Sequence, residues 1–248
     1  MINCIPMKES RVRIGDAAKV LGVTPQTLRN WEKIGKLVPQ RSVGAQRYYV
    51  LADIQRLKID VPKLAWVWAA SAQPAVIPND MYCERQDRFT SRVEKMGTLL
   101  LHELGAQTRD IVSLVTLVVG EIGDNSFAHN AGNWPDVLGV FFSYDINKRI
   151  IVLADRGQGV RQTLQRVRPA IASDVDALHV AFTEVVSGRD PEKRGNGLKV
   201  IRQVAEEHPI GLLFRSGIGL VQIPKEAGQM KITMAKENIR GVYAVISF

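Results

Sequence analysis

The stretch IVSLVTLVVGEIGDNSFAHN, residues 111–130, is apolar on nearly every side up to Val119 and then turns polar. Its second half carries four side chains that can bind protons or metals: Glu121, Asp124, Asn125 and His129. The apolar half is typical of a helix packed beneath a sheet. Because Glu121 and Asn125 are four residues apart, they would project from the same face of that helix. The polar end must therefore serve a purpose other than core packing.

Two glycine-rich segments follow this helix. Residues 155–159 read Asp-Arg-Gly-Gln-Gly after the strand-like stretch RIIVLAD, and residues 195–198 read Gly-Asn-Gly-Leu at the start of a helical pattern. Each motif alone is weak, because Asp-x-Gly-x-Gly occurs by chance in any turn-rich protein. Their order and their strand or helix context are together much rarer.

Together with Glu121 and Asn125, these segments resemble the N-box, G1 box and G2 box of the GHKL superfamily. That superfamily includes the ATPase domains of type II topoisomerases, chaperone ATPases, histidine kinases and anti-sigma-factor serine kinases. The resemblance covers residues 90–248 and keeps the family order of the motifs. It implies a GHKL ATP-binding domain at residues 89–248, with a Bergerat-type α/β sandwich: a mixed, mostly antiparallel sheet with helices on one face. Four short strand-like segments in the tail are expected to belong to that sheet.

The resemblance also implies a role for each motif. Asn125 would hold Mg²⁺ through its side-chain oxygen, a hard ligand for a hard cation, and Glu121 would orient or deprotonate the attacking water or protein hydroxyl. Asp155 would accept a hydrogen bond from the adenine amino group, and the glycine-opened helix end would face phosphate. The implied cofactors are ATP and Mg²⁺, bound by Asn125, Asp155, Gly157, Gly159, Gly195, Asn196, Gly197 and Leu198.

Two side chains beside these motifs have more than one interpretation. Asp124 either joins the magnesium shell or lies in solvent, and His129 is either a functional group or a hydrogen-bonding residue at the helix end. Residues 160–194 would form a lid over ATP. The charged residues near the end of that lid either neutralise the triphosphate or are simply solvated: Arg189, Lys193 and Arg194.

The N-terminal part of the chain carries a separate pattern. A short helix with apolar residues on one face would end at Gly22, which can adopt the positive φ of a helix end. Thr24 would cap a second helix, with Pro25 at its first position. The inward face of the second helix would hold Leu28, Trp31 and Ile34. A small hairpin with Gly44 in its tip follows.

This helix, turn, helix and hairpin resemble the winged helix-turn-helix of the MerR family across residues 11–58. A DNA-binding domain is therefore expected at residues 1–60, with double-stranded DNA as its partner. By the resemblance, the second helix would approach bases through Gln26, Thr27 and Arg29, and the wing would grip the backbone through Arg47 and Tyr48. The alternative is a helical protein-interaction module in which Trp31 and Tyr48 are ordinary core residues.

The distribution of charge favours a polyanion partner. The 248 residues carry 33 Lys and Arg against 25 Asp and Glu, a net charge of +8, and residues 1–60 alone hold eleven basic against five acidic side chains. This bias points to DNA, although a solvated surface that keeps the protein soluble would explain a weaker one. The long dimerisation helix of MerR regulators is not obvious here, so a homodimer would form through another part or not at all.

Residues 61–88 mix prolines with aromatic residues and keep no regular period, which predicts a linker. Trp66 and Trp68 are expected to pack on a neighbouring domain, since a free linker would not retain two tryptophans in water. The longest apolar run, residues 111–119, is shorter than the roughly 20 residues that cross a bilayer. Cys4 and Cys83 are far apart in sequence and indicate neither a disulfide framework nor a zinc site. We expect a cytoplasmic protein with no membrane association.

The sequence thus predicts an α+β protein: a cytoplasmic DNA-binding regulator whose ATP-binding domain couples nucleotide state to DNA binding or to dimerisation. Two alternatives use the same three motifs. One is a serine/threonine protein kinase of the anti-sigma-factor type, acting on a protein partner, and the other is a slow ATP hydrolase. The chain has no room for the second domain that supplies a catalytic lysine in topoisomerases, so rapid hydrolysis is not expected.

Overall fold

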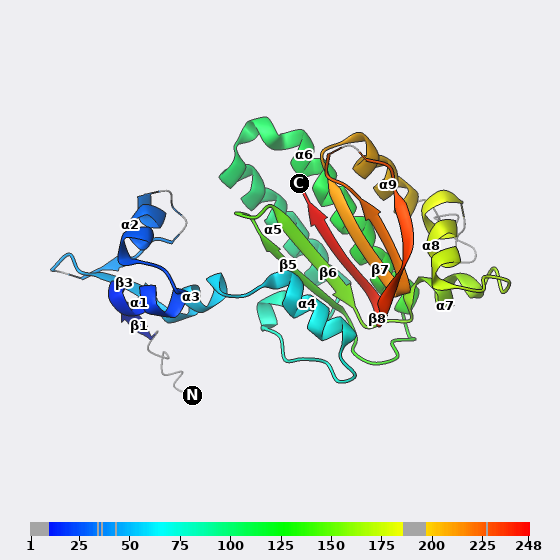
Figure 1. Ribbon diagram of the computed structural model, residues 1–248, viewed down its shortest axis with the longest axis horizontal. Coiled ribbons are helices and arrows are strands. Elements are labelled where there is room, and N and C mark those ends of the chain that lie inside the picture. The colour runs from blue at the N-terminus through cyan, green and yellow to red at the C-terminus, as the bar shows by residue number, and fades with distance from the viewer. Residues whose placement is uncertain (1–9, 34, 36, 43, 186–196, 227) are drawn as a thin grey trace. The chain divides into compact units, whose positions relative to one another are not determined.

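A computed structural model describes residues 10–33, 35, 37–42, 44–185, 197–226 and 228–248. The chain divides into two compact units, Met1–Asp60 and Val61–Phe248 (Figure 1). Each unit has a hydrophobic core of its own.

The smaller unit is a helix-turn-helix with a three-stranded antiparallel wing of strand order β1-β3-β2. Its helices are α1 (Ile14–Leu21), α2 (Pro25–Lys33) and α3 (Leu51–Leu57). Its strands are β1 (Arg11–Arg13), β2 (Gln40–Arg41) and β3 (Arg47–Val50). The wing therefore has one strand more than the two that the sequence predicted, because residues 11–13 pair with β3.

Local chemistry sets the turn between α1 and α2. Gly22 adopts a φ of +67° at the end of α1, and the Thr24 hydroxyl accepts a hydrogen bond from the Thr27 amide at 3.1 Å. Both predicted helix-end signals are thus confirmed. The core beneath them is built from Ala17, Ala18, Leu28, Leu37, Tyr49 and Ile54. Ile34, the third predicted inward residue of α2, lies outside the described residues.

The larger unit is built on a five-stranded sheet of order β4-β5-β6-β8-β7. Its strands are β4 (Tyr82–Cys83), β5 (Val140–Asp145), β6 (Ile150–Asp155), β7 (Gly211–Ile223) and β8 (Lys231–Ser247). Every pairing between these described strands is antiparallel. The sequence had predicted a mixed, mostly antiparallel sheet, and the expected parallel part is not found among the described strands. The four short strands expected in the tail form two long strands, β7 and β8. Glycines lie where the pairing of β7 with β8 is irregular, for example Gly217 with a φ of +59°. In the sequence these glycines were interpreted as the ends of separate strands.

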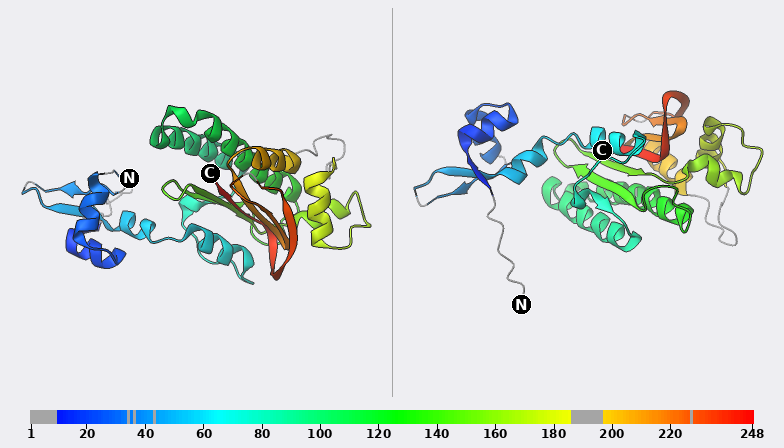
Figure 2. Two further views of the ribbon diagram at one scale, coloured as in Figure 1. Left: turned by 45° about the horizontal axis from the view of Figure 1, so that its top comes forward. Right: turned by 90° about the horizontal axis from the view of Figure 1, so that it is seen from below.

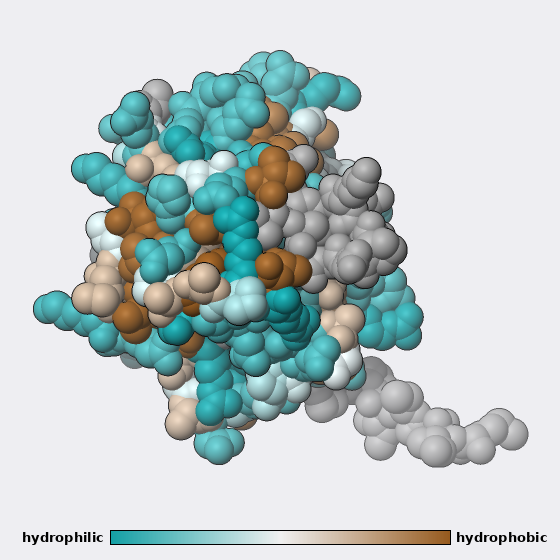
Figure 3. All heavy atoms as spheres, turned by 90° about the vertical axis from the view of Figure 1, so that its right-hand side faces the viewer, coloured by the Kyte–Doolittle hydropathy of each residue, from teal (hydrophilic) through white to brown (hydrophobic). Residues whose placement is uncertain are grey.

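Helices cover both faces of this sheet (Figure 2). One face carries α5 (Gln86–Leu104), α6 (Arg109–Asn130) and α9 (Gly197–Glu207), and the other carries α4 (Val61–Ala70). The shorter helices α7 (Gly159–Gln165) and α8 (Asp174–Thr183) lie at one end. On the surface at that end, apolar side chains lie among hydrophilic ones (Figure 3). The expectation of helices on one face only is therefore wrong.

The error arose from α4, because residues 61–88 were predicted to be a linker. They belong to the larger unit, and α4 packs against β6 and β8. Pro62 lies in the first turn of α4, where the missing N–H of proline costs no hydrogen bond, so it does not break the helix. Trp68 is 2% exposed and its ring lies 6.3 Å from that of Phe141. Both tryptophans are packed, as the sequence predicted, but Trp66 lies against Tyr243 and Trp68 against Phe141 within their own unit.

The core of the larger unit lies between the sheet and the pair α5 and α6. Helix α6 buries one or two residues in each turn, including Val112, Val115, Val119 and Ile122. By length and composition alone, residues 106–130 could span a membrane. In this fold the apolar side chains on one face of α6 belong to the core, while the last turns of α6 reach the cleft described below.

Candidate functional site

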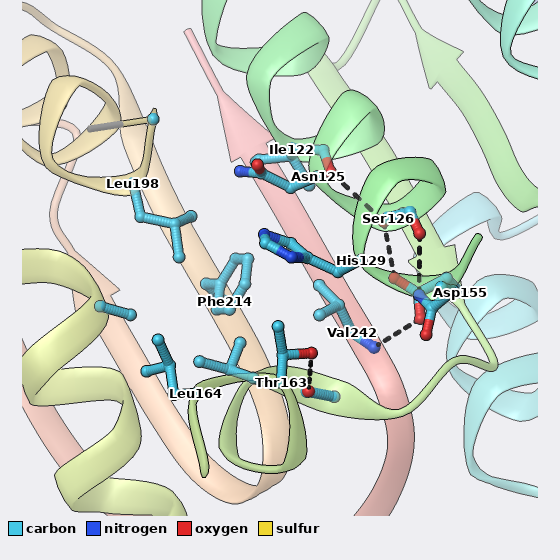
Figure 4. Close-up of a pocket in the computed structure, with 15 residues that line it drawn as sticks. Ile122, Asn125, Ser126, His129, Asp155, Thr163, Leu164, Leu198, Phe214 and Val242 are labelled. Atoms are coloured by element: carbon cyan, nitrogen blue, oxygen red, sulfur yellow. Dashed lines mark hydrogen bonds between the residues drawn. The ribbon is translucent and has the colours of Figure 1, made fainter. Parts of the chain in front are cut away.

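A cleft opens in the larger unit between the last turns of α6, the helices α7, α8 and α9, and strands β7 and β8 (Figure 4). Its empty space measures about 780 Å³, part of which is open to solvent. Six of its side chains are polar: Asn125, Ser126, His129, Asn130, Asp155 and Thr163. Most other side chains in the lining are apolar. An apolar hollow with a few convergent polar groups is the usual form of a small-molecule site.

The three sequence motifs meet at this cleft. Asn125, Asp155 and Gly159 line it together with Gly197 and Leu198, although the motifs are far apart along the chain. Figure 4 shows Asn125 and His129 extending from α6 into the cleft, opposite Leu198. Two further predicted residues, Gly195 and Asn196, lie outside the described residues, as do Arg189, Lys193 and Arg194 of the expected lid.

Asp155 lies at the floor of the cleft and is 1% exposed. Its Oδ2 accepts a hydrogen bond from the Ser126 hydroxyl at 2.6 Å, and its Oδ1 accepts from the amides of Gly157 at 2.8 Å and Val242 at 3.3 Å. Burial raises the pKa of Asp155, and these three hydrogen bonds act in the opposite direction. The carboxylate is thus held in one orientation by donors from α6, the following loop and β8.

The loop after Asp155 is held by Asn130, the last residue of α6. The Asn130 side chain accepts a hydrogen bond from the Gln158 amide and donates one to the Ser126 carbonyl, both at 2.8 Å. Gly157 is buried rather than part of the lining, and a Cβ at this position would overlap the Asn130 side chain. Glycine is required here for the close approach of two chain segments.

At the other end of the cleft, the first turn of α9 approaches Glu121 and Asn125. A Cβ on Gly197 would stand 2.5 Å from the Glu121 Oε2 and 3.2 Å from the Asn125 Nδ2. Glycine at position 197 therefore lets the backbone at the start of α9 come close to both side chains. Glu121 is half-buried and lies beside the lining rather than within it.

The two remaining polar side chains of α6 differ in where they lie: Asp124 is outside the cleft and His129 lines it. Asp124 is exposed and accepts a hydrogen bond from the Gln86 side chain at 3.0 Å, so it lies in solvent and away from the cleft. His129 is half-buried and lines the cleft. Among the described residues, no group of three or more His, Cys, Asp or Glu side chains is placed to hold a metal ion. A cation at Asn125 would therefore need most of its ligands from a bound molecule or from water.

Arg156, the neighbour of Asp155, points away from the cleft and has a fully buried side chain. It donates to the carbonyls of Trp68 at 2.5 Å, Ser71 at 2.9 Å and Ala72 at 3.2 Å, at and just beyond the end of α4. It also pairs with Asp136 through its Nε at 2.8 Å and through a terminal nitrogen at 2.5 Å. Carbonyls at a helix end have no partner within the helix, and Arg156 supplies one.

Ser126, Asn130 and Thr163 also belong to the site, although they were not predicted from the sequence. The signal for the first two was present, since Ser126 and Asn130 are four residues apart and continue the polar stripe of α6. Thr163 lies in α7, one turn after Gly159, and donates to the Gly159 carbonyl at 2.9 Å. Nothing in the sequence distinguishes it from other threonines.

A second candidate surface lies in the smaller unit. Gln26 and Arg29 are exposed on α2 and hydrogen-bonded to each other at 3.2 Å, whereas Thr27 is half-buried next to Thr24. The Tyr48 hydroxyl donates to Gln46 at 3.0 Å. These groups lie on α2 and on the wing, the two elements that the sequence predicted to meet DNA.

Glu32 connects these two elements. Its carboxylate accepts from Arg41 at 2.5 Å and from Arg47 at 2.6 Å, so it joins α2 to both strands of the wing hairpin. Two hydrogen bonds lower the pKa of Glu32 below its ordinary value, with the larger effect from Arg47 and the smaller from Arg41. Arg47 is therefore held in place before any ligand arrives.

Comparison with known protein families gave a match within the smaller unit. Residues 13–49 match the model of the MerR family regulatory protein, which supports the predicted DNA-binding helix-turn-helix. No curated protein and no solved structure matched the chain.

Proposed function

We propose that this protein is a DNA-binding regulator whose larger unit binds ATP and Mg²⁺. The observation that carries the second part is the meeting of Asn125, Asp155 and Gly197, from three separate motifs, around one cleft. The α+β arrangement, with an antiparallel sheet covered by α5, α6 and α9, is compatible with a Bergerat-type ATP-binding fold. We keep a cytoplasmic location as part of this proposal.

Asp155 suits recognition of an adenine amino group. An ionised carboxylate offers about four lone-pair positions, and three are used by Ser126, Gly157 and Val242. The remaining one can accept a hydrogen bond from an exocyclic amine. Apolar side chains on two sides of the cleft, including Leu164 and Phe214, would contact the faces of the base.

The start of α9 suits phosphate. Its first amides have no partner within the helix and carry the positive end of the helix dipole, which favours anions. Asn125 would hold Mg²⁺ through its amide oxygen beside the phosphates, in keeping with the preference of this cation for oxygen ligands and water. Once bound, the cation would neutralise part of the triphosphate charge.

Double-stranded DNA is the partner proposed for the smaller unit. The family match, the exposed polar face of α2 and the concentration of positive charge in residues 1–60 support it. MerR family regulators often dimerise, and a homodimer would present two recognition helices to adjacent half-sites. In this proposal the state of the cleft changes the affinity for DNA or the tendency to dimerise.

Isothermal titration of the full chain with Mg-ATP tests the proposed cleft. The wild type is expected to bind saturably, and Asn125→Ala is expected to bind at least about tenfold more weakly if it removes a metal ligand, a loss of roughly 1.4 kcal/mol. Asn133→Ala, an exposed asparagine beyond the end of α6, is the matched control and should bind like the wild type. Absence of saturable binding by the wild type would refute the proposal.

Glu121 favours a second candidate, transfer of the γ-phosphoryl group to a protein or to water. Its carboxylate lies beside the start of α9 and next to Asn125, where the end of a triphosphate would lie. A carboxylate in that place can orient a hydroxyl or a water molecule. Phosphate appearing on a partner protein and lost in Glu121→Gln would establish a serine/threonine kinase, whereas free phosphate lost in the same variant would establish a slow hydrolase.

A further inference from the structure

Helix α4 is tied at both ends to residues that stand next to the floor of the cleft. At its C-terminal end, Arg156 donates to the Trp68, Ser71 and Ala72 carbonyls, and Arg156 directly follows Asp155. At its N-terminal end, the Tyr243 hydroxyl donates to the Pro62 carbonyl at 3.2 Å. Tyr243 directly follows Val242, whose amide donates to Asp155.

The alternation of side chains along a strand explains this arrangement. Asp155 and Val242 face the cleft on the α6 side of the sheet, so their successors Arg156 and Tyr243 emerge on the α4 side. The α4 side is tightly filled. Trp66 stacks edge-on against Tyr243 with ring centroids 5.3 Å apart, and the Arg215 guanidinium lies 4.7 Å from the Trp66 ring.

We propose that α4 transmits occupation of the cleft to the DNA-binding unit, with Arg156 and Tyr243 as the positioning residues that hold it. This inference rests on the proposed binding of ATP. A base that bonds to Asp155 adds a hydrogen bond to a carboxylate that already accepts from the Gly157 and Val242 amides. Gly157 directly follows Arg156, and Val242 directly precedes Tyr243. A change at the carboxylate therefore reaches both ends of α4 at once.

The order of elements along the chain gives α4 this role. It is the first helix of the larger unit, and only residues 58–60 separate it from α3, the last helix of the smaller unit. A helix with packed side chains behaves as one body, so a shift at its ends is passed along its length. Any movement of α4 acts directly on the short connection to the DNA-binding unit.

Two variants isolate the two attachments. Tyr243→Phe removes only the hydroxyl that bonds to Pro62 and keeps the ring against Trp66. Arg156→Lys keeps the positive charge beside Asp136 but has too few donors to serve the α4 carbonyls as well. Tyr144→Phe is the matched control, since its ring packs against the core cluster of α5 and α6 instead of α4.

Three quantities are measured on the full chain: the Kd of Mg-ATP, amide hydrogen exchange in residues 61–72 with and without Mg-ATP, and the Kd of DNA with and without Mg-ATP. In the wild type and in Tyr144→Phe, Mg-ATP should change the exchange of α4 and shift the Kd of DNA by at least about fivefold. Tyr243→Phe should bind Mg-ATP within about twofold of the wild type and lose most of both changes, since its altered bond lies outside the cleft.

The outcomes separate this inference from the function on which it rests. If the wild type does not bind Mg-ATP, the proposed function fails and this inference fails with it. If the wild type binds Mg-ATP but α4 exchange stays the same, or if Tyr243→Phe and Arg156→Lys keep the full shift in the Kd of DNA, only the role of α4 is overturned.

Discussion

Asp155 and Arg156 are neighbours in the chain, and both are buried, yet they face opposite sides of the sheet. Asp155 collects donors from α6, the following loop and β8, and keeps one acceptor position for a ligand. Arg156 collects carbonyl acceptors from the end of α4 and the carboxylate of Asp136. A buried charge needs compensating partners: Arg156 has the counter-charge of Asp136 together with hydrogen bonds, whereas the Asp155 carboxylate is compensated by hydrogen bonds.

The raised pKa of Asp155 predicts a pH dependence of base binding. The adenine amino group needs an ionised acceptor, so affinity should fall as the pH drops through the pKa of Asp155, which burial places above its ordinary value of 3.8. Folding stability changes in the opposite direction. Because the pKa of Asp155 is raised in the folded state, its contribution to folding stability is largest at low pH and is lost as the pH rises through this pKa.

Adenosine is the appropriate probe, because it has no phosphate that titrates in the same range. Its Kd for the full chain should increase as the pH is lowered toward the raised pKa of Asp155. A Kd that stays constant while the adenine remains neutral would contradict the assignment of Asp155 as an ionised acceptor.

The pair of Arg156 and Asp136 predicts a large loss of stability when it is broken. Asp136→Ala leaves the fully buried Arg156 guanidinium without its counter-charge, which should lower the free energy of unfolding by about 3–5 kcal/mol. Lys148→Ala, which breaks the exposed pair with Asp145, should cost about 0–1 kcal/mol. Urea denaturation followed by circular dichroism measures both, and equal losses would show that burial of the Arg156 pair does not matter.

The sequence predicted those site residues whose chemistry is unusual for their surroundings. Glu121 and Asn125 stand out because they interrupt an apolar helix, and Asp155 stands out because it ends an apolar strand. Ser126 and Asn130 were not predicted although they continue the polar stripe of α6, and Thr163 could not be found in this way, since polar residues near helix ends and turns are common. Their place in the site depends on contacts between segments that only the fold brings together.

At the scale of elements, a glycine lets α5 approach α6 closely. Gly123 is buried in α6, and a Cβ there would overlap the Phe89 ring of α5. Gly123→Ala should therefore destabilise the larger unit by about 1–3 kcal/mol through overpacking. Gly120→Ala, in the same helix with no atom within 4 Å of the added Cβ, should stabilise it by up to about 1 kcal/mol.

Thermal unfolding of the two alanine variants measures this difference. Since both changes replace glycine by alanine in one helix, the intrinsic gain in helix propensity is shared and only the contact with Phe89 differs. Equal melting temperatures for the two variants would contradict the packing of α5 on α6.

The wing of the smaller unit predicts a defined salt dependence of DNA binding. Arg47 is positioned by Glu32, and each phosphate contact contributes about 0.9 to the slope of log Kd against log salt concentration. Arg47→Ala should reduce that slope by about this amount, and Lys148→Ala in the larger unit should leave it unchanged. An unchanged slope for Arg47→Ala would show that Arg47 makes no phosphate contact.

Elements with strong local signals could be predicted, and elements defined by packing could not. The turn of the smaller unit is set by Gly22 and Thr24, which act within a few residues and so are visible in the sequence. Helix α4 has prolines nearby and no amphipathic period, because it is held by Arg156 and by the sheet instead of by its own pattern. The joining of short segments into β7 and β8 likewise depends on pairing across the sheet.

At the scale of the whole molecule, the chain combines a basic reader with a cleft built for a different ligand. Residues 1–60 carry six of the eight excess positive charges, whereas the larger unit is nearly balanced. Attraction to a polyanion is therefore concentrated in the unit that matches the MerR family. The larger unit contributes the cleft, and α4 is the element that joins its floor to the chain leading from the smaller unit.

The most direct test of the central claim is a crystal structure of the full chain grown with Mg²⁺ and a non-hydrolysable ATP analogue. We expect the adenine amino group to lie within hydrogen-bond distance of the Asp155 carboxylate, with the phosphates at the start of α9 and the cation beside Asn125. A nucleotide bound elsewhere on the larger unit, or a cleft that stays free of nucleotide at saturating concentration, would contradict the account.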